Sequence, residues 1–301
     1  MKEKRLFGIY HTDCSKDEKR FEELAGSDFV NVFLVEGNYL EKVFSDNFEL
    51  LKPHPDKGVF VSVSYLGFRT QPCSAADVGE EVCVPACEML SDFKERVDAF
   101  VRFLKERGYY EQVIGFYMDE PMLWGVTNEQ LELFTGYFRT QAAPDKRFFI
   151  CFSLAGVAPE YWTIKGAQSI TPESSRHLTD IAFDLYHPWS GDYEKIYQKM
   201  MERTGNRTDI RVWFIPCTMD YRGDKREERC LEHLENCYRL LRRAPRAGGL
   251  MCYTYHTFPS HEEDLGNIGL DKLTDPSYPK YWKKLLCKAA RICSVSRFRT
   301  A

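Results

Sequence analysis

Residues 93–121 read FKERVDAFVRFLKERGYYEQVIGFYMDEP and contain two elements of different periodicity. In the first half, apolar residues recur at helical spacing, which predicts an amphipathic helix that ends at Gly108. The second half contains a continuous apolar run, Val113–Met118, which predicts a buried strand. The expected buried face of the helix consists of Phe93, Val97, Phe100, Val101 and Leu104. A helix followed directly by a buried strand is the repeating unit of parallel α/β folds.

The same alternation extends over the whole chain. Thr127 and Gln130 have the spacing of a capping box, which predicts that the next helix begins there. Seven further apolar runs lie at 6–10, 29–35, 59–65, 148–152, 181–186, 212–215 and 250–255. Eight strands with helices between them favour a closed (β/α)8 TIM barrel over an open doubly wound sheet. We therefore expect one α/β domain over residues 1–301, with a long loop insertion at about 66–90.

Composition narrows the class of protein. The 301 residues carry a net charge of −4, which argues against a basic nucleic-acid-binding protein. Hydrophobic residues make up 44% of the chain, enough for a large core. No apolar stretch reaches the length of about 18 residues that a membrane-spanning helix needs, so no membrane partner is expected. The N-terminal residues do not resemble a signal peptide, so we expect a cytoplasmic protein. Whether a leader has been removed, and which oligomeric state the protein has, stay open.

The cysteines indicate packing rather than cross-linking. There are 11 of them, so at least one cannot form a disulfide within the chain. Several lie inside apolar runs, where cysteine behaves as a small buried hydrophobic residue. Cys73, Cys83 and Cys87 form one local cluster, for which ordinary loop thiols, a metal site and a disulfide all stay open.

Polar residues at the ends of the expected strands are the candidate site, because TIM barrels carry their active sites at the C-terminal ends of the strands. The sharpest candidates are Asp119 and Glu120, two adjacent carboxylates that close an apolar strand before Pro121. Like charges this close, and partly buried, should raise at least one pKa, as a general acid requires. The alternative is a helix-capping Asp beside a solvated Glu. The other candidates are His11, Tyr117, Asp184, Tyr186, Trp189, Asp220, Tyr253, Tyr255 and His256.

The Asp119-Glu120-Pro121 motif resembles two groups of glycoside hydrolases. Retaining enzymes with (β/α)8 barrels carry Asn-Glu-Pro at strand four, and this chain has Asp119 in place of the Asn. The adjacent Asp-Glu pair resembles the β-N-acetylhexosaminidase-type families and some uncharacterised glycosidase-like barrels. The resemblance implies that Glu120 protonates the leaving oxygen. It also implies that Asp119 orients and polarises a 2-acetamido group of the substrate, which acts as the nucleophile.

The expected seventh strand bears on the choice between these mechanisms. Residues 215–220 read IPCTMD and contain no Glu, where the retaining enzymes have their nucleophile. Asp220 lies past the expected end of the strand. This counts against a retaining mechanism with two carboxylates and agrees with substrate assistance. An inverting mechanism, with Asp184 or Asp220 as the base, stays open.

Aromatic residues near the same strand ends favour a sugar as the ligand. Asp184 and Tyr186 share a parity along their strand, as do Tyr253 and Tyr255, so each pair can face the barrel axis. Trp189 could stack on a sugar ring, although Tyr and Trp at a rim can also be plain packing.

Two histidines raise a metal-binding alternative. His11 and His256 follow strands that become neighbours when a barrel closes, and together with Asp13 or Glu36 they could bind a metal. The chain lacks His-x-His and His-Glu-x-x-His spacings, so we expect neither a metal nor a cofactor. The expected function is a glycoside hydrolase-like enzyme with a carbohydrate substrate. The alternatives are a non-catalytic carbohydrate-binding barrel and a metal-dependent barrel hydrolase.

Overall fold

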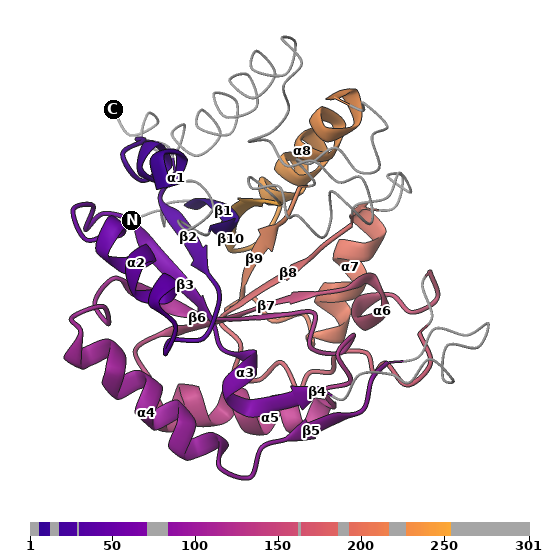
Figure 1. Cartoon of the computed structure of the whole chain (residues 1–301). Coiled ribbons are helices and arrows are strands. Elements are labelled where there is room, and N and C mark those ends of the chain that lie inside the picture. The colour runs from indigo at the N-terminus through magenta and orange to yellow at the C-terminus, as the bar shows by residue number, and fades with distance from the viewer. Residues whose placement is uncertain are drawn as a thin grey trace. The chain divides into compact units, whose positions relative to one another are not determined.

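A computed structural model describes residues 6–12, 18–28, 30–70, 84–161, 164–185, 193–216 and 227–253 of the chain. Eight strands form a closed barrel in the order β1-β10-β9-β8-β7-β6-β3-β2 (Figure 1). Their bounds are β1 Leu6–Thr12, β2 Val32–Val35, β3 Gly58–Ser62, β6 Val113–Asp119, β7 Arg147–Phe152, β8 Asp180–Phe183, β9 Arg211–Phe214 and β10 Ala247–Cys252. Each strand overlaps one of the eight apolar runs, so the predicted (β/α)8 TIM barrel is confirmed.

Helices connect most of the strands, as the alternation predicted. Their bounds are α1 Glu18–Ala25, α2 Lys42–Leu51, α3 Ser64–Gly67, α4 Phe93–Glu106, α5 Asn128–Tyr137, the π-helical turn η1 Phe138–Ala142, α6 Leu154–Val157, α7 Tyr193–Arg203 and α8 Glu227–Leu241. The buried residues of α4 are the five predicted from its apolar spacing, and Gly108 beyond its end has a φ of +73°. The capping box at the start of α5 is also present, because the side chains of Thr127 and Gln130 each accept the other residue's backbone N–H.

The chain divides into two compact units. The first comprises Met1–Val59, Tyr186–Ser190 and Trp213–Ala301, and the second comprises Phe60–Leu185 and Gly191–Val212. The candidate carboxylates Asp119, Glu120 and Asp184 therefore all belong to the second unit. The geometry among these three residues is internal to that unit.

In the first unit, an aromatic side chain of β9 packs against two adjacent glycines of β10. Trp213 is fully buried in β9, and it occupies the space beside Gly248 and Gly249 of β10. A Cβ atom on Gly249 would lie 2.1 Å from the carbonyl oxygen of Leu6, so only glycine fits at this position. The pair of glycines thus lets β10 approach both its neighbour β1 and the indole ring.

The second unit has an aromatic core. The ring of Phe149 on β7 lies 5.2 Å from that of Phe60 and 5.1 Å from that of Tyr117. Arg147 forms an ion pair with the buried carboxylate of Asp180, in which Nε lies 2.8 Å from Oδ2. The hydroxyl of Thr179 donates to the same carboxylate at 2.7 Å. Because Arg147 and Asp180 begin β7 and β8, this ion pair fixes the end of the strands opposite to the candidate site.

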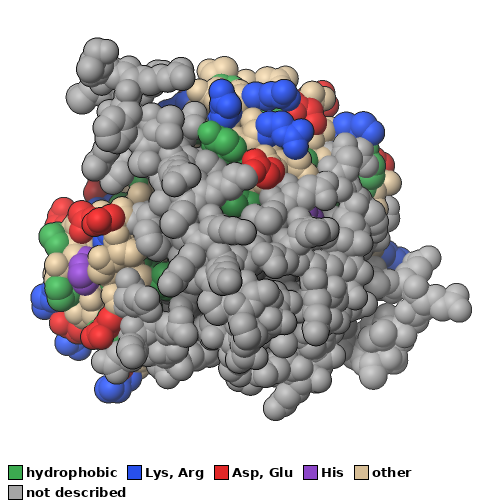
Figure 2. Space-filling view, turned by 90° about the horizontal axis from the view of Figure 1, so that it is seen from above, with side chains coloured by type: hydrophobic (Ala, Val, Ile, Leu, Met, Phe, Trp, Pro, Cys, Tyr) green, Lys and Arg blue, Asp and Glu red, His purple; other side chains and the backbone are tan. Residues whose placement is uncertain are grey.

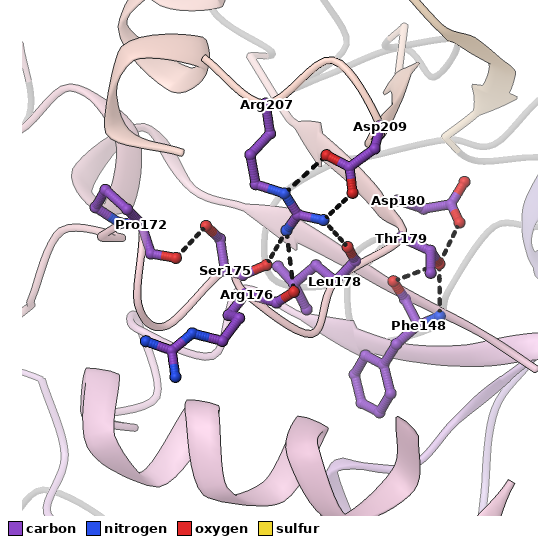
Figure 3. Close-up of polar contacts among 9 residues, drawn as sticks. All are labelled: Phe148, Pro172, Ser175, Arg176, Leu178, Thr179, Asp180, Arg207 and Asp209. Carbon is purple, nitrogen blue, oxygen red and sulfur yellow. Dashed lines mark hydrogen bonds and ion pairs between the residues drawn. The ribbon is translucent and has the colours of Figure 1, made fainter. Parts of the chain in front are cut away.

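Arg207 ties a turn to this same end of the second unit. Its guanidinium donates to the carbonyl oxygens of Ser175 at 2.5 Å and Leu178 at 3.2 Å (Figure 3). It also pairs with Asp209, with Nη2 and Oδ2 2.6 Å apart. A planar guanidinium satisfies several backbone carbonyls at once, so Arg207 stabilises the turn that leads into β8.

The predicted loop at 66–90 contains regular structure at both ends. Phe68–Thr70 (β4) and Cys87–Met89 (β5) pair as an antiparallel two-stranded sheet, with Phe68 opposite Met89. The third apolar run also ends sooner than expected, because the backbone N–H of Val63 donates to the carbonyl oxygen of Tyr117 and α3 follows. The prediction of a single loop at 66–90 missed these two strands, because a strand of three residues is too short to show an alternation of apolar and polar residues.

The described cysteines agree with the prediction of reduced packing residues. Among the described residues, Cys87, Cys151, Cys237 and Cys252 form no disulfide with one another, and all but Cys87 are buried. Cys73 and Cys83 lie outside the described residues. Among the helices of the described ranges, none is long and apolar enough to cross a membrane. Figure 2 shows Lys and Arg side chains interspersed with Asp and Glu on the described residues of one face.

Candidate active site

Three carboxylates converge where β7 ends. Asp119 lies opposite Cys151 of β7 in the sheet register, and the backbone N–H of Glu120 donates to the carbonyl oxygen of Cys151 at 2.9 Å. From the other side, the backbone N–H of Asp184 donates to the carbonyl oxygen of Phe152 at 3.3 Å. Consecutive carbonyls of β7 thus hold Glu120 and Asp184 on its two flanks.

The backbone of Glu120 departs from the strand pattern. Side chains alternate between the two faces of a strand, so a regular continuation of β6 would turn Glu120 away from the face that carries Tyr117 and Asp119. Glu120 instead has a φ of +41°, in the left-handed region that non-glycine residues seldom adopt. With this conformation, its carboxyl group forms a side-chain hydrogen bond with Asp184. Strain of this kind costs about 1–3 kcal/mol and concentrates at functional sites.

The surroundings of Glu120 favour its protonated form. Burial away from water is the largest cause that raises the pKa of Glu120, to about 10. The negative charges of Asp184 and Asp119 raise that pKa further, as does the hydrogen bond that protonated Glu120 donates to Asp184. At neutral pH Glu120 is therefore protonated. A carboxyl group held neutral in this way can act as a proton donor.

Asp119 is held by a tyrosine from its own strand. The hydroxyl of Tyr117 donates to Oδ1 of Asp119 at 2.8 Å, and the exposed fraction of Tyr117 is 0%. Side chains two residues apart on a strand lie on the same face, so the contact between Tyr117 and Asp119 follows from local geometry. The structure thus gives Tyr117 a role in orienting Asp119, and the contact with substrate expected for Tyr117 stays a prediction.

Cys151 lies beneath the carboxylates and was not anticipated as part of the site. Burial, followed by the charges of Asp184, Asp119 and Glu120, raises the pKa of the Cys151 thiol well above its ordinary value. Its side chain also forms a hydrogen bond with Tyr117. A thiol that stays protonated is a poor nucleophile, so we do not assign Cys151 a role as the nucleophile.

Ser153 is a second residue that the sequence did not single out. It is 1% exposed and precedes α6 as its N-cap, yet its side chain makes no capping hydrogen bond. Among the described residues, its hydroxyl oxygen has no hydrogen-bond partner. Its extended backbone, with φ of −67° and ψ of 163°, continues the alternation of β7 and places it on the same face as Cys151. The even spacing from Cys151 is the signal in the sequence that could have identified it.

The remaining predicted site residues belong to the first unit or lie outside the described residues. Tyr253 follows β10, is half-buried, and packs edge-on against Tyr10 with ring centroids 5.1 Å apart. His11 lies in β1, but its side chain is outside the described residues. The predictions that fall wholly outside them are Tyr186, Trp189, Asp220, Tyr255 and His256. Within the described ranges, no group of three His, Cys, Asp or Glu side chains is arranged to hold a metal ion.

Comparison with known proteins identifies the fold and no closer relationship. No protein-family model and no curated protein sequence matches the chain. Among solved structures, a fungal β-1,4-galactanase is similar with a TM-score of 0.56 at 11% identity, over 89% of this chain and 94% of that one. A GH10 xylanase from Thermobacillus composti gives a TM-score of 0.55 at 12% identity, over 86% of this chain and 87% of that one.

A chitinase from Chromobacterium violaceum is also similar, with a TM-score of 0.51 at 10% identity, over 94% of this chain and 99% of that one. These neighbours are glycoside hydrolases built on (β/α)8 barrels. At such low identity the likeness extends to the fold and leaves the chemistry to the site itself.

Proposed function

We propose that this protein is a glycoside hydrolase-like enzyme that cleaves a glycosidic bond with Glu120 as its general acid/base. The observation that carries the proposal is the neutral, half-buried carboxyl group of Glu120, hydrogen-bonded to Asp184 at the C-terminal end of a barrel strand. That end of a TIM barrel is where catalysis takes place. The similarity of the fold to a galactanase, a xylanase and a chitinase supports a carbohydrate as the substrate.

In the first step, Glu120 donates its proton to the glycosidic oxygen while the bond between that oxygen and the anomeric carbon breaks. The electron pair of the broken bond stays with the leaving oxygen, which departs as a hydroxyl group. Glu120 is left as a carboxylate and can then take a proton from the water that attacks the sugar. The same residue thus serves as acid and as base, and returns to its starting state.

Substrate assistance supplies the nucleophile in this proposal. The carbonyl oxygen of a 2-acetamido group on the substrate attacks the anomeric carbon and forms a cyclic intermediate, which water later opens. Asp119 accepts a hydrogen bond from the acetamido N–H and stabilises the positive charge that develops there. The bond from Tyr117 fixes the carboxylate of Asp119 for this task. No nucleophile from the protein is required, which agrees with the missing Glu in residues 215–220.

The contact between Glu120 and Asp184 argues against Asp184 as the base of an inverting enzyme. In such enzymes the two carboxyl groups stand about 6.5–9.5 Å apart to leave room for a water molecule. We infer that Asp184, whose negative charge raises the pKa of Glu120, stands too close to Glu120 for such a water molecule. We therefore assign Asp184 the task of keeping the proton on Glu120 before the reaction.

The test is a hydrolysis assay with a panel of aryl glycosides that includes 2-acetamido sugars. The wild-type chain should release the aryl alcohol from at least one of them. Glu120→Gln should lower kcat by about 10²–10⁴-fold, which is the usual contribution of general acid–base catalysis. Glu129→Gln, on the exposed surface of α5, is the matched control and should keep the wild-type rate. A Glu120→Gln variant that hydrolyses its substrate normally would overturn the assignment.

A non-catalytic carbohydrate-binding barrel is the second candidate. The absence of a Glu in residues 215–220 favours it, because a two-carboxylate retaining mechanism then lacks its nucleophile. Such a protein would bind a sugar without releasing product from any aryl glycoside, and Glu120→Gln would leave the affinity close to that of the wild type.

A further inference from the structure

The segment that follows Glu120 is a tightly hydrogen-bonded turn. The backbone N–H of Leu123 donates to the carbonyl oxygen of Glu120 at 2.8 Å, and that of Val126 donates to Pro121 at 3.0 Å. Between them, the N–H of Gly125 donates to Met122 at 3.2 Å. These bonds lead directly into Thr127, the capping residue of α5. The turn is therefore an ordered connection from the proposed acid to a helix.

Buried side chains anchor this turn on both sides of Trp124. Met122 is 1% exposed and Val126 is 3% exposed. Gly125 has a φ of +80°, and a Cβ atom there would lie 2.2 Å from the carbonyl oxygen of Pro85. The backbone thus packs closely against the segment before β5. In contrast, 51% of the surface of Trp124 is exposed.

The position of Trp124 suits a ligand that also reaches Glu120. Its backbone N–H lies within reach of the carbonyl oxygens of Pro121, at 3.2 Å, and of Glu120, at 3.4 Å. The bond to Glu120 runs from residue i+4 to residue i, so it brings the backbones of Trp124 and Glu120 close together. An exposed indole four residues after the proton donor is available to a neighbouring unit of the same substrate.

Few large apolar side chains are exposed on the described residues, which favours a small flat ligand for Trp124 over a protein partner. Within the described ranges, the exposed large apolar side chains are Leu40, Trp124 and Leu133. Single apolar residues are ordinary on a protein surface, and a stable protein interface needs about 1,000 Å² or more with a buried centre. An indole alone is sufficient to stack against the C–H face of one sugar ring.

We propose that Trp124 is a stacking platform for a second sugar ring, and that the substrate is an oligosaccharide or polysaccharide rather than a single glycoside. The inference rests on the proposed function, and it specifies the length of the substrate. Because the turn is already ordered, stacking on Trp124 costs little conformational entropy. The residue contributes to binding of the longer substrate and takes no part in proton transfer.

The binding test uses Glu120→Gln as the parent, so that no substrate is consumed. Affinities for chitin, xylan and galactan oligosaccharides are measured by calorimetry in this parent and after adding Trp124→Ala or Trp124→Phe. Trp124→Ala should weaken binding of a bound oligosaccharide by about 3- to 10-fold, in keeping with the energy of aromatic stacking. Trp124→Phe should recover most of the affinity. Leu133→Ala removes an apolar side chain of the same 51% exposure from α5, and it should change nothing.

The kinetic test uses the active chain. Trp124→Ala should lower the ratio of kcat/KM for an aryl trisaccharide to kcat/KM for the aryl monosaccharide, and Leu133→Ala should leave that ratio unchanged. Unchanged oligosaccharide affinity in Trp124→Ala, or no affinity of the parent for any oligosaccharide, would overturn the inference. Hydrolysis of a monosaccharide glycoside would still support the proposed function in that case. Binding that depends on Trp124 without any hydrolysis would overturn the proposed function alone.

Discussion

The carboxyl group of Glu120, at the end of β6, is hydrogen-bonded to the carboxyl group of Asp184, just past the end of β8. One strand lies between them, and its last carbonyls bind the backbone N–H groups of both residues. The contact also depends on the left-handed backbone of Glu120. The raised pKa of Glu120 follows from this arrangement, and it leads to specific expectations for variants.

Replacing Asp184 should move the pH profile of the enzyme. Asp184→Asn removes the negative charge that, after burial, contributes most to the raised pKa of Glu120. Without that charge the carboxylate form of Glu120 is less disfavoured, so Glu120 should lose its proton at a lower pH. The alkaline limb of kcat/KM against pH should therefore shift to lower pH. Asp145→Asn, at a carboxylate bound by Tyr110, is the control, and an alkaline limb that stays in place in Asp184→Asn would contradict the expectation.

Glu120→Gln should stabilise the fold, and more so as pH rises. The pKa of Glu120 is raised in the folded state to about 10, so the folded state holds a proton that the unfolded chain loses above its ordinary pKa. Stability of the wild type contributed by this group is thus present at low pH and declines as pH rises toward the folded pKa, by on the order of 1 kcal/mol per pH unit. Gln does not titrate.

The difference in unfolding free energy between Glu120→Gln and the wild type should therefore be small near pH 4 and should grow toward pH 9. Urea denaturation at several pH values measures it. A difference that stays constant with pH would show that the folded state does not hold this proton.

The backbone of Glu120 should favour glycine over alanine. Glu120→Gly and Glu120→Ala both remove the carboxyl group, but only glycine adopts positive φ without steric cost. The Gly variant should be more stable than the Ala variant by about 1–2 kcal/mol in thermal or urea unfolding. At most other positions φ is negative, and an Ala variant is then more stable than a Gly variant. Asn206, with a φ of +54°, offers a second position where the same order is expected. An Ala variant more stable than Gly at position 120 would refute the left-handed conformation.

Ser153→Ala should leave stability unchanged or raise it. Removing a hydroxyl that has no partner among the described residues breaks no hydrogen bond and removes a desolvated polar group. Ser174 is the matched control, because it is also buried and its hydroxyl exchanges hydrogen bonds with Thr171. Ser174→Ala should therefore lower the unfolding free energy by about 1 kcal/mol. If Ser153→Ala costs as much as Ser174→Ala, the Ser153 hydroxyl has a partner in the folded protein.

Local patterns predicted more of the fold than of the site. Helical spacing identified the five buried residues of α4, and the capping box fixed the start of α5, because both depend only on neighbours a few residues apart. The strand of Tyr117 and the adjacent Asp119 and Glu120 were likewise evident from one apolar run and its end. The pairing of β4 with β5 was missed, since short strands are stabilised by contacts that the local sequence does not reveal.

The sequence by itself determined that the chain alternates strands and helices, and that two carboxylates end the fourth strand of the barrel. These features are fixed by periodicity and by the sterics of adjacent residues. Only the tertiary structure decided that Glu120 turns to Asp184, that Tyr117 holds Asp119, and that the buried Cys151 lies near these carboxylates. The physical reason is that the charge state of a carboxyl group depends on its burial and on charges brought close by strand register. Both are set by residues far away along the chain.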